Sequence, residues 1–306
     1  MADIARLRSF VAVAEAGSIS RAAEVLYIAQ PALSLQIKSL ETKLGLSLFE
    51  RLPRGVKLTS EGELLLGAAT RVLRAFDRFS DHAAALRDQR GPELQVGSMA
   101  HGAGDLMLEI LRQLRTDHPE VKLRLRQFNF EDPTVGIGRG LVDVGFVTGP
   151  VDPIAGIEVV TLSYEPIVAA VSSDHPLAAR REVSIHELLT FRFVTDTLDG
   201  GAWHDFWLAM SYRQPGDPVE KVTFALHDEC LDAVALNLGV SICPASTPRF
   251  YPRPGVAWIS VYDIQPAPLN LLWRPDDAEP IVRRFVECAR KATRVFDEVG
   301  TPADLA

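Results

Sequence analysis

Residues 18–41 read SISRAAEVLYIAQPALSLQIKSLE, and this stretch decides the fold of the N-terminal region. Ser18 can cap the start of a short helix, in which the small Ala22 lets another helix approach closely. A second helix begins near Pro31, where the missing N–H costs little, and ends at Gly45. Its apolar residues recur at a helical period; they are Leu33, Ile37, Leu40 and Leu44. The stretch therefore predicts two helices joined by a tight turn.

The flanking residues add a third helix and a ribbon. Upstream, one apolar helical face ends at Gly17; it consists of Leu7, Phe10, Val11 and Ala14. Downstream, residues 48–51 and 56–58 flank the turn Pro53-Arg54-Gly55 and predict a two-stranded ribbon with basic residues at its tip. Three helices and a ribbon in the first 58 residues are typical of a winged helix-turn-helix.

A long amphipathic helix is predicted over residues 59–90. Ser60 and Glu63 have the spacing of a capping box, and Gly91-Pro92 follows the helix. Its apolar residues are spaced alternately by four and three positions; they are Leu65, Ala69, Val72, Phe76, Phe79, Ala83 and Leu86. This heptad spacing favours a self-pairing helix, and the alternative is a helix packed on its own domain.

Composition and charge limit the class of protein. The chain has 306 residues with 47% hydrophobic and 24% charged side chains, which is typical of a folded chain of two or more domains. Residues 1–58 carry eight Lys and Arg against five Asp and Glu, a net +3, so the net −8 of the chain leaves −11 on residues 59–306. A basic head on an acidic body indicates that the head meets phosphates.

The lack of a recognisable targeting signal and the wide spacing of the cysteines favour a reducing compartment. No stretch reaches the roughly 20 apolar residues of a membrane span, and the N-terminus shows no secretory signal pattern. The three cysteines are far apart and show no C-x-x-C spacing; they are Cys230, Cys243 and Cys288. We therefore expect reduced thiols and a cytoplasmic location.

Beyond Pro92, strands alternate with helices, which predicts parallel sheets with helical crossovers. The alternation falls into two α/β halves. The first half is expected at about 91–161 and 266–306, and the second at about 162–265. Two halves crossed twice by the chain form a hinged cleft, which is a usual place for a small ligand.

Residues 18–62 resemble the N-terminal signature of LysR-type transcriptional regulators. The matching segments are 18–26 (second helix), 29–41 (recognition helix), 46–51 (wing) and 58–62 (linker start). The resemblance implies a DNA-binding domain over 1–58, a dimerising linker helix over 59–90 and an effector-binding domain over 91–306. That last domain would be periplasmic-binding-protein-like, with two Rossmann-like subdomains. The implied partners are double-stranded DNA, a small-molecule effector, a second copy in a homodimer or homotetramer, and RNA polymerase at the promoter.

The predicted DNA-binding residues are Arg21, Gln30, Pro31, Ser34, Leu35, Lys38, Arg51 and Arg54. If the apolar face of the recognition helix points inward, Gln30 and Ser34 can hydrogen-bond to bases or phosphates, and Leu35 can touch a thymine methyl. Lys38 would meet a phosphate, and Arg54 could enter the minor groove. Many relatives carry Ser where this chain has Ala29, so the hydroxyl cap is absent and the free helix N–H groups are left to a phosphate.

The predicted effector-binding residues follow strand ends or begin helices. They are Ser98, Met99, Ala100, His101, Asn129, Thr148, Thr195, Thr197, Trp203 and His227. Hydroxyls and N–H groups at helix starts bind carboxylates, so a small organic acid is expected, and an aromatic one could stack on Trp203. For each residue, a role in a turn, a cap or the core is the alternative.

Enzyme signatures are incomplete, so a non-enzyme without metal or cofactor is expected. Residues 136–140 lack the G-x-G-x-x-G spacing, and residues 239–243 miss the second glycine of G-x-S-x-G. The alternatives are a solute-binding module with a helical head, or an α/β enzyme. Cys230 and Cys243 could sense peroxide as some LysR members do, although their apolar context is typical of inert thiols.

Overall fold

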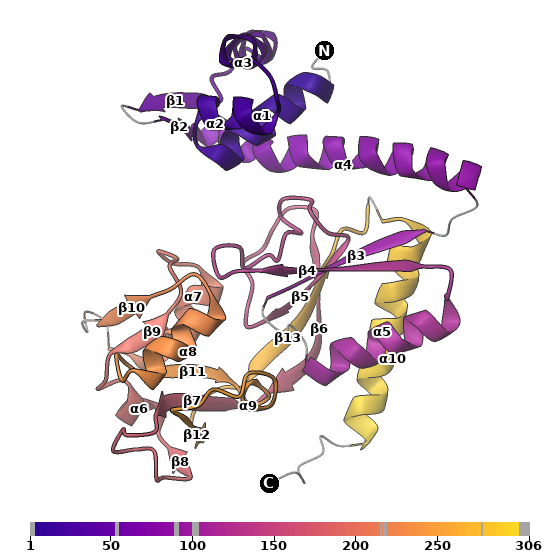
Figure 1. Ribbon diagram of the computed structural model, residues 1–306. Coiled ribbons are helices and arrows are strands. Elements are labelled where there is room, and N and C mark those ends of the chain that lie inside the picture. Colours follow the sequence, from indigo (N-terminus) through magenta and orange to yellow (C-terminus); the bar gives the residue numbers. More distant parts are fainter. Residues whose placement is uncertain are drawn as a thin grey trace. The chain divides into compact units, whose positions relative to one another are not determined.

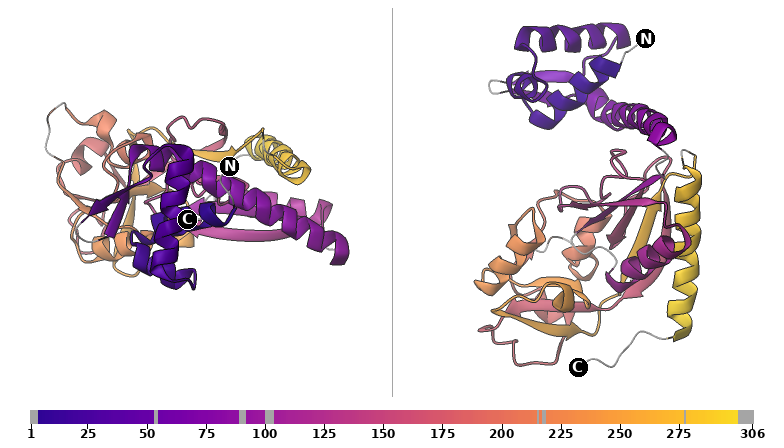
Figure 2. Two further views of the ribbon diagram at one scale, coloured as in Figure 1. Left: turned by 90° about the horizontal axis from the view of Figure 1, so that it is seen from above. Right: turned by 45° about the vertical axis from the view of Figure 1, so that its right-hand side comes forward.

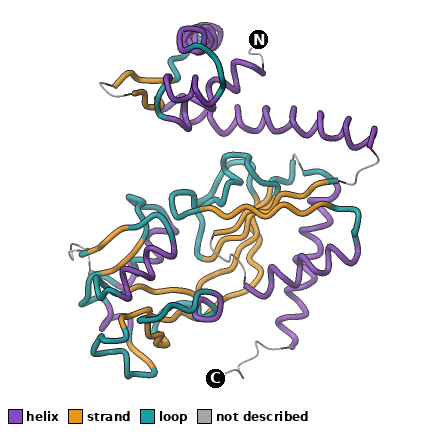
Figure 3. Tube along the Cα trace, in the orientation of Figure 1, coloured by secondary structure: helices purple, strands orange, loops and turns teal. Residues whose placement is uncertain are grey.

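The computed structural model describes residues 4–52, 55–88, 92–99, 104–214, 216, 219–276 and 278–299, without the side chains of residues 78, 81–88 and 294–299. The chain separates into two units (Figure 1). Unit 1 holds the residues up to 91 with residues 138–141, and unit 2 holds the remainder. Among the described strands, unit 1 has only a short ribbon, whereas unit 2 carries the sheets (Figure 3).

Unit 1 begins with the predicted three helices and antiparallel ribbon. Their bounds are α1 Ile4–Ala16, α2 Ile19–Val25, α3 Gln30–Leu44, β1 Phe49–Leu52 and β2 Gly55–Leu58. Phe10, Leu33 and Leu40 are buried among these elements, and the rings of Phe10 and Phe49 meet edge to face with centroids 5.5 Å apart. Burial of each such side chain contributes about 1.5–3 kcal/mol, so the apolar periods determine how the helices meet.

Local sequence sets the helix boundaries in the head. Ser18 caps α2 by accepting a hydrogen bond from the Arg21 N–H, and Gly45 ends α3 at a φ of 69°, a conformation that favours glycine. Ala29 is the N-cap of α3 and makes no side-chain hydrogen bond. These boundaries confirm the predicted helix starts and stops.

The long helix α4 spans Ser60–Asp88, and its N-terminal cap differs from the predicted one. Because Ser60 is already helical, Thr59 is the N-cap, and its hydroxyl accepts a hydrogen bond of 3.0 Å from the Gly62 N–H. The predicted capping box of Ser60 and Glu63 was therefore wrong, because the N-cap lies one residue earlier, at Thr59.

The first sheet of unit 2 has five strands in the order β4-β3-β5-β13-β6. Their bounds are β3 Glu93–Met99, β4 Lys122–Phe128, β5 Val144–Thr148, β6 Glu158–Glu165 and β13 Ala267–Trp273. Helices α5 (Gly104–Asp117) and α10 (Pro280–Val299) lie side by side against this sheet (Figures 1 and 2). The buried Phe146 and Phe285 meet edge to face between the sheet and α10.

The sheet is mixed, which corrects the prediction of parallel sheets. β3 is parallel to β4 and β5, but β13 is antiparallel to both β5 and β6. The chain leaves this sheet through β6 and returns through β13, so the returning strand runs opposite to the strand that left. Because β6 extends to Glu165, the crossing into the second half follows residue 165 rather than residue 161.

The second half contains a sheet with the strand order β11-β7-β12-β8. A parallel pair of strands, β9 and β10, is joined to the edge of this sheet by a bridge between Phe193 and Val240. The remaining elements are β7 Ile167–Ser172, β8 Glu182–Val183, α6 Ile185–Leu188, β9 Phe193–Thr195, α7 Ala202–Trp207, η1 Met210–Tyr212, β10 Lys221–Thr223, α8 His227–Ala235, β11 Ser241–Pro244, α9 Thr247–Phe250 and β12 Val256–Val261. β7 is antiparallel to β11 and β12 and is central to this half.

Candidate functional site

The outward face of α3 is exposed as predicted. Leu33, Ile37 and Leu40 are buried, whereas Leu35 is 73% exposed and Lys38 is also exposed. Single exposed leucines are common on protein surfaces, so the exposure of Leu35 makes it accessible to a partner, and an ordinary surface leucine is the alternative. The predicted division of α3 into an inner and an outer face is confirmed.

Two side-chain contacts fix α3 relative to its neighbours. The Ser9 hydroxyl of α1 hydrogen-bonds to the Gln36 side-chain oxygen. Glu41 Oε1 accepts hydrogen bonds from the Leu48 N–H at 2.8 Å and from the Phe49 N–H at 3.3 Å, where the ribbon begins. Helix and ribbon are therefore held as one rigid surface.

A groove runs between α3 and the ribbon. It brings together five of the eight predicted DNA-binding residues, namely Pro31, Ser34, Leu35, Lys38 and Arg51. Gln30 and Arg21 are exposed but do not line the groove, and Arg54 lies outside the described residues. Lys38 and Arg51 make the lining basic, while Glu41 contributes a carboxylate that is already bonded to the ribbon backbone.

The apolar stripe of α4 divides into two parts. Leu65 and Ala69 pack into the core of the head, so the alternative of packing on its own domain holds for them. Val72, Phe76 and Phe79 remain 47%, 42% and 70% exposed. Ala83 and Leu86 belong to α4, but their side chains lie outside the described residues. The surface that is free to pair with another molecule is thus shorter than predicted.

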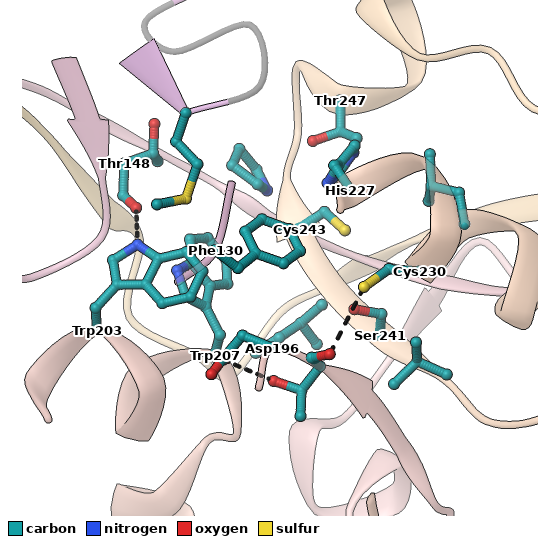
Figure 4. Close-up of a pocket in the computed structure, with 16 residues that line it drawn as sticks. Phe130, Thr148, Asp196, Trp203, Trp207, His227, Cys230, Ser241, Cys243 and Thr247 are labelled. Carbon is teal, nitrogen blue, oxygen red and sulfur yellow. Dashed lines mark hydrogen bonds between the residues drawn. The ribbon is translucent and has the colours of Figure 1, made fainter. Parts of the chain in front are cut away.

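A pocket opens between the two halves of unit 2 and has a cavity volume of about 80 Å³ (Figure 4). The first half contributes Met99, Phe130 and Thr148. The second half contributes the rest of the lining, which consists of Val194, Thr195, Asp196, Trp203, Trp207, His227, Cys230, Leu231, Ser241, Ile242, Cys243, Pro244 and Thr247. Figure 4 shows the two indole rings on one side of the pocket and His227 with Thr247 on the other.

The aromatic wall is held by both halves. The Trp203 Nε1–H donates a hydrogen bond of 2.9 Å to the Thr148 carbonyl, and the Trp203 ring lies 5.4 Å from that of Phe130. Gly149, at a φ of 109°, leaves room for the indoles, because a Cβ there would lie 3.0 Å from Trp207 Nε1 and 3.1 Å from Trp203 Cδ1. A ring of this kind offers a flat apolar surface to a ligand.

A buried carboxylate forms the base of the second half of the pocket. Asp196 is 2% exposed and accepts hydrogen bonds from the Thr195 hydroxyl at 3.0 Å and the Leu198 N–H at 2.8 Å. His204 Nδ1 lies 2.7 Å from the same carboxylate, and its Nε2 lies 3.3 Å from Lys221 Nζ. This satisfied network fixes the carboxylate in place.

The two thiols of the pocket are protonated at neutral pH. Burial raises the pKa of Cys243 to about 12. Burial, with smaller effects from Cys243 and Asp196, raises the pKa of Cys230 far above its usual range. Because the thiolate is the reactive form, these cysteines lack the property that a peroxide sensor needs.

The structure brings together five of the ten predicted effector residues: Met99, Thr148, Thr195, Trp203 and His227. Ala100 and His101 lie outside the described residues. The other three do not line the pocket; they are Ser98, Asn129 and Thr197, and Asn129 instead donates to Glu131. Each of these three is adjacent in sequence to a lining residue: Met99, Phe130 and Asp196, respectively.

Sequence reasoning missed several lining residues. Phe130 directly follows the predicted Asn129, and Asp196 directly precedes the predicted Thr197. Trp207 lies one helical turn after Trp203, so the helical period of α7 could have indicated it. The sequence around Thr247 has no pattern that predicts a binding residue, because α9 is a single helical turn. It reaches the pocket only because it follows β11, which runs antiparallel to β7.

Comparison with known proteins agrees with this arrangement. Residues 4–63 match the family described as bacterial regulatory helix-turn-helix protein, lysR family, and residues 87–294 match the LysR substrate binding domain. The chain belongs to the LysR family of transcriptional regulators. It is 30% identical to the Hca operon transcriptional activator HcaR of Escherichia coli (strain K12), over 93% of this chain and 96% of that protein. It is 32% identical to the HTH-type transcriptional regulator YnfL of the same strain, over 81% and 84%.

Solved structures give the same assignment. The chain resembles the LysR-family regulator CbnR with a TM-score of 0.66 and 25% identity, over 95% of this chain and 99% of CbnR. The resemblance confirms the predicted fold: a helix-turn-helix head followed by an α/β effector-binding domain. This LysR chain is a DNA-binding transcriptional regulator rather than an enzyme. Within the described residues, no helix is long and apolar enough to cross a membrane.

Proposed function

We propose that this LysR-type regulator reads duplex DNA with α3 and the ribbon, and that a small effector in the pocket of unit 2 changes how it binds. The observation that supports the DNA-reading surface most directly is the groove that joins Pro31, Ser34, Leu35 and Lys38 to Arg51. A protruding helix beside a basic ribbon fits the major groove with its neighbouring phosphates.

We assign individual roles by chemistry. Gln30 pairs with an adenine edge, Ser34 with a base or phosphate, and Leu35 with a thymine methyl. Pro31 packs beside them at the start of α3. Lys38, Arg51 and Arg21 meet phosphates, and Arg54 extends the ribbon toward the minor groove. A crystal structure of full-length CbnR with its target DNA has been solved, and the present chain resembles it with a TM-score of 0.54 and 25% identity.

We further propose that the chain acts as a homodimer or homotetramer. The exposed Val72, Phe76 and Phe79 of α4 would pack against the same residues of a second copy, since exposed apolar stripes of this spacing favour self-pairing. Pairing places two heads on two half-sites, which multiplies affinity without new contacts. RNA polymerase at the promoter would be the further partner, in the cytoplasm, where the DNA is.

The effector would act by population shift. Its pocket is lined by both halves of unit 2, so a ligand there favours one degree of closure, and α4 would transmit the change to the spacing of the heads. Of the aromatic and acidic ligand classes expected from the sequence, the lining supports the aromatic one, because the rings of Phe130, Trp203 and Trp207 dominate it.

The deciding experiment is a binding titration on fragments of the source genome. We expect the full chain to select a few fragments over random DNA, with log K falling linearly with log salt. Gln30→Ala should lower binding to the selected fragments by about 1–3 kcal/mol while leaving random DNA unaffected. An equal loss on selected and random DNA would remove Gln30 from base reading, and no selection by the wild-type chain would overturn the proposed function.

A further inference from the structure

Two polar atoms in the pocket wall are buried without a hydrogen-bond partner among the described residues. They are Thr247 Oγ1 and Trp207 Nε1. Thr247 is fully buried, and Trp207 is only 9% exposed. Native proteins rarely leave such groups unpaired, because each loses its hydrogen bonds to water and gains none in return. An unpaired hydroxyl in the wall of a pocket therefore indicates where a polar atom of a ligand binds.

The two groups stand on opposite walls. Trp207 comes from α7 and Thr247 from α9, and Figure 4 shows them on either side of the cavity. Its volume of about 80 Å³ is several times the roughly 10–15 Å³ that one water needs. The Trp207 Nε1 packs against Gly149, where a Cβ would lie only 3.0 Å away, so the Thr247 hydroxyl, which can donate or accept, is the group left to a ligand.

The charge of the lining selects among ligands. No described lining residue is Lys or Arg, and the only carboxylate is the buried Asp196. The Lys221 ammonium lies behind His204, on the far side from Asp196, and does not line the pocket. The remaining titratable ring, His227, packs edge-on against Phe130 and Tyr251. Against the described lining, an anion would lose its hydration, gain no Lys or Arg partner and face Asp196.

We propose that the effector is an uncharged aromatic molecule that packs on the indole rings and shares a hydrogen bond with the Thr247 hydroxyl. The inference rests on the proposed function, since it concerns the ligand of the same pocket. It replaces the organic acid that the sequence predicts, because the described lining supplies rings and neutral polar groups in place of cations.

A first test needs no ligand. Thr247→Val removes the unpaired hydroxyl at nearly constant volume, so the melting temperature of the full chain should stay unchanged or rise. Thr195→Val is the matched control, because the Thr195 hydroxyl is equally buried but bonds to Asp196, so its loss should lower the melting temperature. A melting temperature for Thr247→Val that falls as far as that of Thr195→Val would show that the hydroxyl has a structural partner and overturn the proposal.

The second test uses matched pairs of probes, measured by calorimetry on the full chain at neutral pH. The pairs are benzamide with benzoate, phenylacetamide with phenylacetate, and salicylamide with salicylate. We expect the amide of at least one pair to bind at least tenfold more tightly than its acid. Thr247→Val should then weaken that amide by roughly three- to tenfold, the effect of one neutral hydrogen bond. Acids that bind as tightly as amides, no binding by any pair, or an unchanged affinity in Thr247→Val would each contradict the proposal.

A parallel DNA titration separates the two possible failures. If the chain selects genomic fragments but prefers the acids, only the inference about charge fails. If the chain selects no DNA, the proposed function fails, whatever the probes show.

Discussion

The groove of unit 1 and the pocket of unit 2 differ in their surfaces, so they would recognise their proposed partners by opposite means. The groove is exposed and basic, with Lys38 and Arg51 in contact with water. The pocket is largely apolar, and the one carboxylate of its described lining, Asp196, is engaged by its neighbours. Contacts in the groove should therefore depend on salt, whereas contacts in the pocket should depend on shape and on desolvation. On the proposed function, one chain would combine salt-sensitive DNA binding with salt-insensitive binding of a small molecule.

The largest expected effect separates the two units. Phe10→Ala removes a buried ring from the head core and should destabilise unit 1 by about 3–5 kcal/mol, which abolishes DNA binding. Calorimetry should show the head transition lost and the transition of unit 2 retained. Phe285→Ala is the matched control, since Phe285 is equally buried in unit 2. A single unfolding transition, with a melting temperature that both variants lower equally, would show that the units do not unfold separately.

A smaller effect tests the salt dependence of the groove. Lys38→Ala should weaken binding to all DNA sequences about equally, by roughly 1 kcal/mol, and reduce the slope of log K against log salt by about one phosphate contact. Fluorescence anisotropy at several salt concentrations measures both. Lys122→Ala removes the same charge from unit 2 and should change neither. A loss confined to one DNA sequence would make Lys38 a base-reading residue.

The start of α3 offers a still smaller effect. Ala29→Ser supplies the missing N-cap hydroxyl and should stabilise the head by about 0.5–1 kcal/mol. Because the new hydroxyl would bond the N–H groups that we assign to a phosphate, DNA affinity should stay the same or fall. Thermal melting and anisotropy distinguish the two effects. Tighter DNA binding by this variant would argue against the phosphate at the helix start.

The pocket thiols should give no regulatory effect. Because burial raises the pKa of Cys243 to about 12, its thiolate is scarce at pH 8, and its alkylation should accelerate as the pH rises. Cys288, which is only partly buried, should react first with iodoacetamide. Hydrogen peroxide should leave the DNA affinity of the wild-type chain and of a Cys230→Ser, Cys243→Ser variant unchanged. A peroxide response that only the wild type shows would restore the redox alternative.

The groove was largely predictable from the sequence. The groove is made by residues 19–56, so caps, breaks and apolar periods close to one another specify it; the predicted inner and outer faces of α3 were right. Even there, the cap of α4 was displaced by one residue, and Leu65 and Ala69 proved to be core, because a heptad pattern does not say which molecule covers it.

The pocket was only half predictable, because its residues extend from Met99 to Thr247 and meet through the topology of two sheets. Strand positions followed from local alternation, but the antiparallel return of β13 depends on how the chain crosses between the halves. Asp196 lines the pocket in place of the predicted Thr197, because β9 ends at Thr195 and the local pattern does not specify the path of the residues that follow it. Thr247 reaches the pocket through tertiary structure alone.

Nuclease footprinting of the full chain on its selected genomic fragment tests the central claim most directly. Paired heads should protect two half-sites on one face of the duplex, separated by a multiple of about 10–10.5 base pairs. Phe79→Asp, which places a charge on the exposed stripe of α4, should lose the paired pattern and bind more weakly. Protection of a single site by a monomer, or no protection at low salt, would contradict the account.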